Sequence, residues 1–167
     1  MTGQQISMAA AISLHRKLIQ LVGLQYSSSL YCYPYARHVA DLSIGDLRQA
    51  GFSQSKAQTL LTVSQMFVSG ELILNNTQKE PPIKQICQQL LKIHGIGSWT
   101  VNYALLRGYG WLSGSLHDDA AVAPGLHVLL NPAEVTDENQ AQQWLENFVP
   151  WRTLVAAHLW ELVFSGG

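Results

Sequence analysis

The segment that most constrains the fold is LLKIHGIGSWTVNYALL, residues 90–106. An amphipathic run meets Gly-Ile-Gly, and a second helical run starts at once. Gly95 and Gly97 permit a very tight turn between two helices. Such a turn leaves N–H groups of the second helix's first turn pointing outward, where they can bind an anion such as a phosphate. The alternative is that the two glycines only close an αα-hairpin, which is the commoner meaning of this spacing.

The rest of the chain also has helical periodicity. Apolar residues recur three and four positions apart, and strand alternation is nearly absent, so we expect an all-α, compact multi-helix bundle. Capping and helix-breaking residues predict helices over residues 6–22, 43–51, 53–70, 83–91, 98–107 and 137–148. Two more helices are expected to begin at the acidic pair 118–119 and at residue 151. The expected inner faces include Phe67 and Val68, and later Trp151, Leu154 and Leu162. The tyrosine-rich stretch 26–35 is expected to be a loop whose tyrosines pack.

Composition narrows the class of protein. With 167 residues and 47% apolar side chains, one core and a single domain spanning 1–167 are expected. The net charge of -1 provides no overall basic field, so any nucleic-acid contact must be local. Cys32 and Cys87 are too far apart in the sequence for a metal or redox pair, and two cysteines cannot form a four-cysteine iron–sulfur motif. Neither a signal peptide nor a membrane span is apparent, so a soluble cytoplasmic protein is expected.

Four ordered motifs carry a resemblance to a known family: GQQIS (3–7), GFSQSKAQTL (51–60), HGIGSWTVNY (94–103) and VPWRTLVAAHLW (149–160). In these motifs the chain resembles the helix-hairpin-helix (HhH-GPD) DNA glycosylase superfamily, in particular its alkyladenine branch (DNA-3-methyladenine glycosylase II). The resemblance implies a monofunctional glycosylase of base excision repair. Such an enzyme hydrolyses the N-glycosidic bond of damaged bases, chiefly alkylated purines, in double-stranded DNA.

The resemblance also implies site residues. Asp119 takes the position of the catalytic carboxylate, next to Asp118. A fixed carboxylate can stabilise the oxocarbenium-like charge that develops on the sugar and can orient the attacking water. An aspartate at this place could also be an ordinary helix cap. The implied base pocket consists of Trp99, Tyr103, Trp160 and, more weakly, Trp111, whose alternative role is core packing.

DNA contacts are implied for the opening motif and the hairpin: Gln4, Gln5, His94, Gly95, Ile96, Gly97, Ser98 and Thr100. The alternatives are a solvated helix end for the glutamines and a surface histidine without a role. The resemblance further implies a monovalent cation, Na⁺ or K⁺, bound by the main-chain carbonyls of Leu91, Ile93 and Ile96. A water molecule there is the alternative, because backbone ligands leave no side-chain signature.

The position just after the hairpin decides between hydrolysis and strand cleavage. Bifunctional relatives carry a nucleophilic lysine there, whereas this chain has Trp99, and no lysine follows Lys92. Hydrolysis without lyase activity is therefore predicted. Relatives usually carry an N-terminal β domain before the opening motif, so either the chain is naturally minimal, or an N-terminal region or a partner chain is missing. Two other hypotheses are a catalytically silent DNA-binding module and, less favoured, a protein–protein scaffold.

Overall fold

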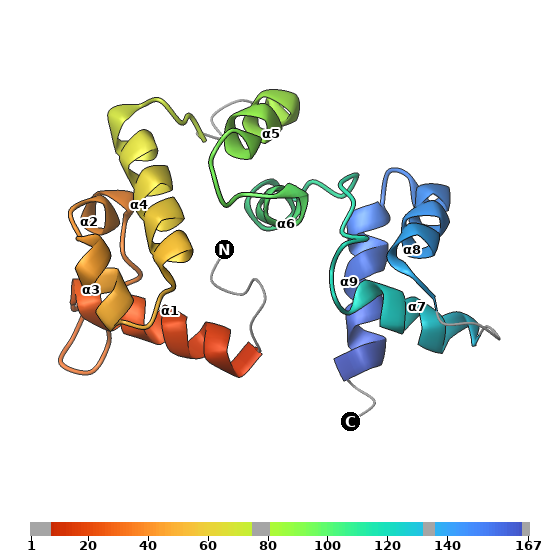
Figure 1. Ribbon diagram of the computed structural model, residues 1–167, viewed down its shortest axis with the longest axis horizontal. Coiled ribbons are helices and arrows are strands. Elements are labelled where there is room, and N and C mark those ends of the chain that lie inside the picture. The colour runs from red at the N-terminus through yellow and green to blue at the C-terminus, as the bar shows by residue number, and fades with distance from the viewer. Residues whose placement is uncertain (1–7, 75–80, 132–135, 165–167) are drawn as a thin grey trace. The chain divides into compact units, whose positions relative to one another are not determined.

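The computed structural model describes residues 8–74, 81–131 and 136–164, and over these residues it contains helices and no β-sheet (Figure 1). The prediction of an all-α fold is confirmed. The chain separates into two compact units, Met1–Ile96 and Gly97–Gly167, which are described separately below. That 1–167 is one domain stays a prediction.

The first unit contains the helices α1 (Met8–Val22), α2 (Ala36–Ala40), α3 (Ile44–Gln49), α4 (Gln54–Ser69) and α5 (Ile83–Leu91). α4 packs against α2 and α3. The hydrophobic core of this unit contains residues of α1, α3, α4 and the loop between α3 and α4: Leu18, Leu47, Phe52, Ala57 and Leu61. The predicted starts of two helices are confirmed. Ser43 accepts a hydrogen bond from the Asp46 N–H, and Ser53 accepts one from the Lys56 N–H.

The Asp46 carboxylate completes a capping box at the start of α3. It accepts hydrogen bonds from the Ser43 hydroxyl (2.7 Å) and the Ser43 N–H (2.8 Å). Both bonds favour the ionised carboxylate, so they lower the pKa of Asp46 below its ordinary value, with the bond to the side chain contributing more. The cap therefore depends on pH.

The second unit contains the helices α6 (Ser98–Tyr109), α7 (Val122–Leu130), α8 (Glu138–Leu145) and α9 (Arg152–Phe164), and the 3₁₀ turn η1 (Glu146–Phe148). Its core residues are Leu116, Val122, Leu126, Ala141, Leu145, Ala156 and Leu159. Gly125 allows α7 and α9 to approach closely, because a Cβ at that position would lie 2.5 Å from the carbonyl oxygen of Leu159.

Predictions about burial are wrong at several positions. Phe67 and Val68 are exposed in the last turn of α4, and Trp151, Leu154 and Leu162 are exposed at or in α9. The inward face of α9 instead carries Thr153, Ala156 and Leu159. Helical periodicity predicts which residues share a stripe, but it does not predict where the covering helices end.

The tyrosines between α1 and α2 pack less than predicted. Tyr26, Tyr31, Tyr33 and Tyr35 are 78%, 44%, 60% and 66% exposed. The backbone around them is folded into a loop, as predicted, and an isolated antiparallel bridge joins Gln25 to Tyr31. These tyrosines do not form part of the core. Along the described ranges, no helix combines the length and the apolarity needed to cross a membrane.

Candidate active site

The acidic pair lies in a turn before α7. We predicted a helix starting at Asp118 and Asp119, but α7 begins at Val122. Asp119 first closes a tight turn. Its Oδ1 accepts a hydrogen bond from the Ala121 N–H at 3.0 Å, and its carbonyl accepts one from the Val122 N–H at 3.0 Å. The backbone that leads into α7 thus fixes the position of the Asp119 carboxylate.

Two consecutive residues of α6 hold the two consecutive carboxylates. Trp99 Nε1 donates to Asp119 Oδ2 at 2.6 Å, and the Ser98 hydroxyl donates to Asp118 Oδ2 at 2.7 Å. Hydrogen bonds to an ionised acceptor are short and strong. Asp118 Oδ1 is buried, with no hydrogen-bond partner within the described part of the chain. The start of α6 therefore fixes the orientation of both acids.

Three of the four predicted pocket aromatics form one cluster. The rings of Trp99 and Tyr103 stack with centroids 5.1 Å apart and an interplanar angle of 6°. Trp160 from α9 lies 6.1 Å from the Tyr103 ring, tilted by 45°. All three side chains are partly exposed, and Nε1 of Trp160 is buried without a hydrogen-bond partner in the described residues. Since Trp99 also binds Asp119, the carboxylate and the aromatic cluster form a single connected site.

Trp111, the fourth candidate, contacts other residues of the same unit. A Cβ placed on Gly114 would lie 3.0 Å from the Trp111 ring and 2.7 Å from Asn102 Oδ1. Trp111 therefore packs against the loop after α6, and the ring contacts described above do not include it.

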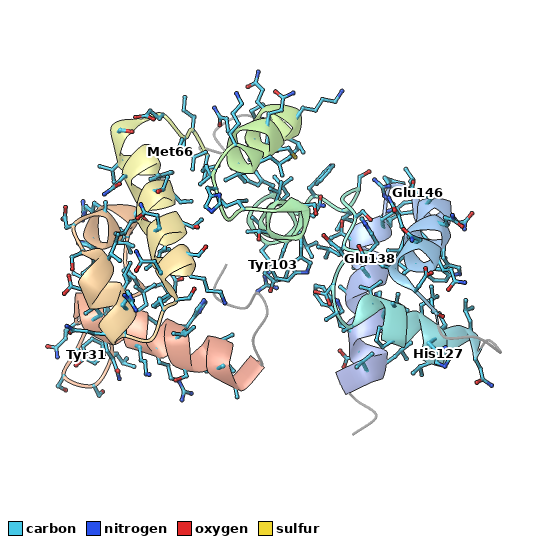
Figure 2. All side chains as sticks on the ribbon, in the orientation of Figure 1. Tyr31, Met66, Tyr103, His127, Glu138 and Glu146 are labelled. Atoms are coloured by element: carbon cyan, nitrogen blue, oxygen red, sulfur yellow. The ribbon has the colours of Figure 1, made fainter. Side chains whose placement is uncertain are left out.

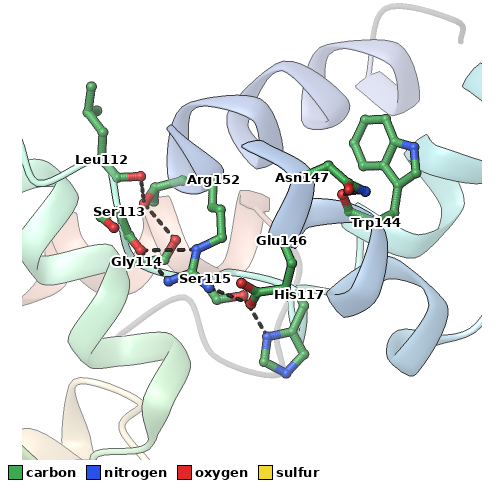
Figure 3. A network of polar contacts seen from close by, with 10 residues as sticks. Leu112, Ser113, Gly114, Ser115, His117, Trp144, Glu146, Asn147 and Arg152 are labelled. Carbon is green, nitrogen blue, oxygen red and sulfur yellow. Dashed lines mark hydrogen bonds and ion pairs between the residues drawn. The ribbon is translucent and has the colours of Figure 1, made fainter. Parts of the chain in front are cut away.

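The start of α9 fixes this loop (Figure 3). The Thr153 hydroxyl, which is fully buried, contacts the carbonyls of Leu112 (2.8 Å) and Gly114 (3.0 Å). Arg152 donates to the Ser113 carbonyl through Nε at 3.1 Å and Nη2 at 2.6 Å, and it also pairs with Glu146. Sequence reasoning did not assign a role to either residue, although both lie within the VPWRT motif.

His117 connects the acidic turn to its neighbours. Its Nδ1 lies 2.8 Å from the Ser115 hydroxyl, and its Nε2 lies 3.8 Å from Glu138 at the start of α8. The residues before Asp118 are therefore held from two sides. This arrangement positions the carboxylates on a supported loop.

The first part of the predicted hairpin lies in the first unit. After α5 ends at Leu91, the Ile96 N–H donates to the Ile93 carbonyl at 3.1 Å, and Gly95 adopts the left-handed conformation with φ +87°. The Thr59 hydroxyl, which is buried in α4, donates to the His94 carbonyl at 2.9 Å and also lies 2.9 Å from the Ser55 carbonyl. Thr59 is thus a positioning residue that no sequence signal indicated, because it lies 35 positions from His94.

The second part of the hairpin begins at Gly97, the N-cap of α6. Gly97 has extended backbone, and it has no side chain to cap the first turn. His94, Gly95, Gly97 and Ser98 are exposed, whereas the side chains of Ile96 and Thr100 are buried. That these residues contact DNA stays a prediction. Gln4 and Gln5 lie outside the described residues.

The net charge of -1 hides an uneven distribution. Residues 1–96 contain eight Lys and Arg against four Asp and Glu, while residues 97–167 contain two against seven. The first unit therefore has a net charge of +4 and the second a net charge of -5. The total charge therefore conceals a first unit whose composition is basic.

An all-α chain with a Gly-Ile-Gly turn between α5 and α6, followed by a tethered acid beside aromatic rings, defines a helix-hairpin-helix protein. Residues 1–150 match the profile described as "HhH-GPD superfamily base excision DNA repair protein". The chain belongs to this superfamily.

Several relatives are similar over nearly the whole chain. A DNA-3-methyladenine glycosylase of Bacillus subtilis (strain 168) is 25% identical over 97% of this chain and 54% of its own length. DNA-3-methyladenine glycosylase 2 of Escherichia coli (strain K12) is 27% identical over 95% of this chain and 53% of its own length. The chain thus spans about half the length of these curated relatives.

A solved structure confirms the fold. The 3-methyladenine DNA glycosylase of Schizosaccharomyces pombe, determined in complex with abasic DNA, superposes with a TM-score of 0.81 at 22% identity. The superposition covers 96% of this chain and 75% of that one.

Proposed function

We propose that this chain is a monofunctional DNA glycosylase domain that excises alkylated bases from double-stranded DNA by hydrolysis. The observation that carries the proposal is the Trp99 Nε1 to Asp119 Oδ2 bond of 2.6 Å, because it joins the acid to the Trp99, Tyr103 and Trp160 cluster. Superfamily membership and the relatives named above support the same conclusion.

The chemistry suits one carboxylate beside aromatic rings. A purine alkylated on a ring nitrogen carries positive charge, which aromatic faces attract. When the N-glycosidic bond breaks, this base takes the bonding electron pair and leaves neutral, so no proton donor is required. The sugar becomes oxocarbenium-like, and the Asp119 carboxylate stabilises it and orients a water molecule. That water adds to the anomeric carbon, and its proton passes to the carboxylate or to solvent.

Trp99 occupies the position where lyases carry a lysine, and Trp99 provides no amine for a Schiff base. Cleavage of the strand is therefore not expected. Flipping a damaged base out of the duplex costs least where pairing is already weak, which adds selectivity before the chemical step.

DNA binding would use the exposed residues of the hairpin. The first turn of α6 has no side-chain cap at Gly97, so a phosphate can accept hydrogen bonds from the N–H groups of that turn. The last carbonyls of α5 carry partial negative charge, and main-chain oxygens have two lone pairs. The carbonyls of Leu91, Ile93 and Ile96 therefore suit Na⁺ or K⁺. The positive charge of the bound ion would attract a phosphate. The Ile93 carbonyl already accepts one hydrogen bond and has a second lone pair for the ion.

Base release from methylated duplex DNA tests the proposal, with alkali treatment to reveal abasic sites. Asp119→Asn should reduce the single-turnover rate by about 100-fold or more. Trp99→Phe keeps an aromatic ring, although a smaller one, and removes the N–H that fixes Asp119, so it should reduce the rate by about ten-fold. Asp118→Asn is the matched control for loss of one charge in the same turn.

Each outcome has a distinct meaning. Equal rates for wild type and Asp119→Asn would refute the catalytic role of Asp119. Strand cleavage without alkali would refute the monofunctional mechanism. A folded wild type that binds duplex but releases no base would instead be a catalytically silent DNA-binding module.

A further inference from the structure

The loop between α1 and α2 is a small, ordered hairpin. The bridge between Gln25 and Tyr31 is reinforced by hydrogen bonds from the Cys32 N–H to the Leu24 carbonyl (2.6 Å) and from the Tyr26 N–H to the Leu30 carbonyl (2.9 Å). Serines 27–29 form its tip. Pro34 is buried, which anchors the chain leaving the loop. The backbone therefore presents its side chains from a fixed frame; Figure 2 labels Tyr31 in this loop.

The side chains on this frame are aromatic and exposed, which the core does not explain. Tyr26, Tyr33 and Tyr35 are each at least 60% exposed, and Tyr31 is 44% exposed. Exposed aromatic residues gathered within ten positions of one another mark a candidate interaction surface. We call these four exposed tyrosines the tyrosine platform: Tyr26, Tyr31, Tyr33 and Tyr35.

Cationic or protonatable groups contact this platform. The Arg37 guanidinium lies 5.3 Å from the Tyr35 ring centroid, and the His38 ring lies 5.8 Å from it. The His15 ring meets Tyr33 edge-on at 6.0 Å. Exposed Arg16 and Lys17 follow His15 in α1. Residues 1–40 contain three Lys and Arg and no Asp or Glu, so the local field favours a polyanion.

Charge and ring exposure together select the ligand. A loop of tyrosine and serine can also bind protein, but a segment without acids and with arginine beside its rings fits phosphates better. Duplex DNA hides its base faces inside the stack, whereas unpaired bases can stack on exposed tyrosines. We propose that the tyrosine platform binds single-stranded DNA, with Arg37 contacting the phosphates. This site belongs to the first unit, whereas Asp119 belongs to the second, and the proposal goes beyond the proposed function.

The test is fluorescence anisotropy of the full chain with a labelled oligothymidylate and with a duplex of the same length. Tyr33→Ala and Tyr35→Ala should each weaken single-strand binding by about ten-fold, since one base stacked on an aromatic ring contributes about 1–3 kcal/mol. Tyr33→Phe and Tyr35→Phe keep the stacking ring and should bind within about two-fold of wild type. Duplex affinity should change little in all four variants.

Three controls make the result specific. Leu30→Ala removes an exposed apolar side chain of the same loop and should not weaken binding. Arg37→Gln should reduce the slope of log affinity against log salt concentration by about 0.7, which is the contribution of one phosphate contact on a single strand. Asp119→Asn should bind oligothymidylate like wild type, so a failure of the proposed catalysis leaves this test unaffected.

The proposal is overturned if the folded wild type has no measurable affinity for oligothymidylate, or if the alanine variants bind it as tightly as wild type. Equal loss with Leu30→Ala and Tyr33→Ala would also overturn it, because that pattern indicates a general apolar contact of the kind a protein partner makes.

Discussion

Replacing Gly95 by alanine places a methyl group against the Thr59 side chain. The new Cβ would overlap the Thr59 hydroxyl and lie 3.3 Å from both Thr59 Cβ and Cγ2, in a backbone with φ +87°. The left-handed conformation costs a residue with a Cβ about 1–2 kcal/mol. Displacing Thr59 from the His94 carbonyl costs about 1 kcal/mol more. Gly95→Ala should therefore lower the free energy of unfolding by about 2–3 kcal/mol.

Gly97→Ala is the matched control, two positions away in the same turn. Nothing lies within 4 Å of a Cβ there, and the backbone is extended, so its effect on stability should stay within about 1 kcal/mol, the loss expected when alanine replaces glycine at an N-cap. Urea unfolding followed by circular dichroism is the suitable measurement. Tryptophan fluorescence would not report on the first unit, because all five tryptophans follow Gly97 in the chain.

A double-mutant cycle isolates the contact itself. Thr59→Ala removes the hydroxyl, so the double variant Thr59→Ala/Gly95→Ala should lose about 1 kcal/mol less than the sum of the single losses. Strict additivity, or equal losses for Gly95→Ala and Gly97→Ala, would refute the claim that Thr59 fixes this turn.

Three further perturbations follow from the second unit and from the α3 cap. Gly125→Ala brings a methyl group to 2.5 Å from the Leu159 carbonyl and should destabilise by about 2–3 kcal/mol, whereas Gly108→Ala faces open space in α6 and should stabilise by about 0.5 kcal/mol. Thermal unfolding followed by tryptophan fluorescence separates them, and equal shifts would contradict the α7–α9 contact. Thr153→Val keeps the shape but removes the hydroxyl's bonds to the Leu112 and Gly114 carbonyls, so a loss of about 2 kcal/mol is expected in urea unfolding. The pKa of Asp46 is lower in the folded state than its unfolded-state value of 3.8, so the ionised carboxylate stabilises the fold at pH values above 3.8. This stabilisation is lost as the pH falls through the lower folded-state pKa. Wild type and Asp46→Asn should therefore differ in unfolding free energy near neutral pH and converge at acidic pH, and a constant difference would contradict this role.

Features that depend on neighbours in the chain were predicted correctly. Ser43, Ser53 and Asp137 start helices and Gly70 ends one, because caps use hydrogen bonds and dihedral angles within a few residues. The all-α class follows from the same local periodicity. The superfamily was identified from four ordered motifs, because each motif is a contiguous string of residues.

Contacts between distant residues could not be predicted in this way. Trp99 and Asp119 are twenty positions apart, and the resemblance assigned both to a site without indicating that one donates to the other. The buried side of α9 includes Thr153, a polar residue that periodicity discounts, because its hydroxyl is satisfied by carbonyls about forty positions earlier.

The two hairpin glycines show what the sequence alone does and does not determine. Sequence determined that Gly95 and Gly97 permit a tight turn, because both lack a side chain. Only the tertiary structure distinguished them. Thr59 packs against Gly95, which has a positive φ, while Gly97 faces open space with extended backbone. Exposure of the loop tyrosines was decided in the same way, since burial depends on which distant elements cover a side chain rather than on the side chain itself.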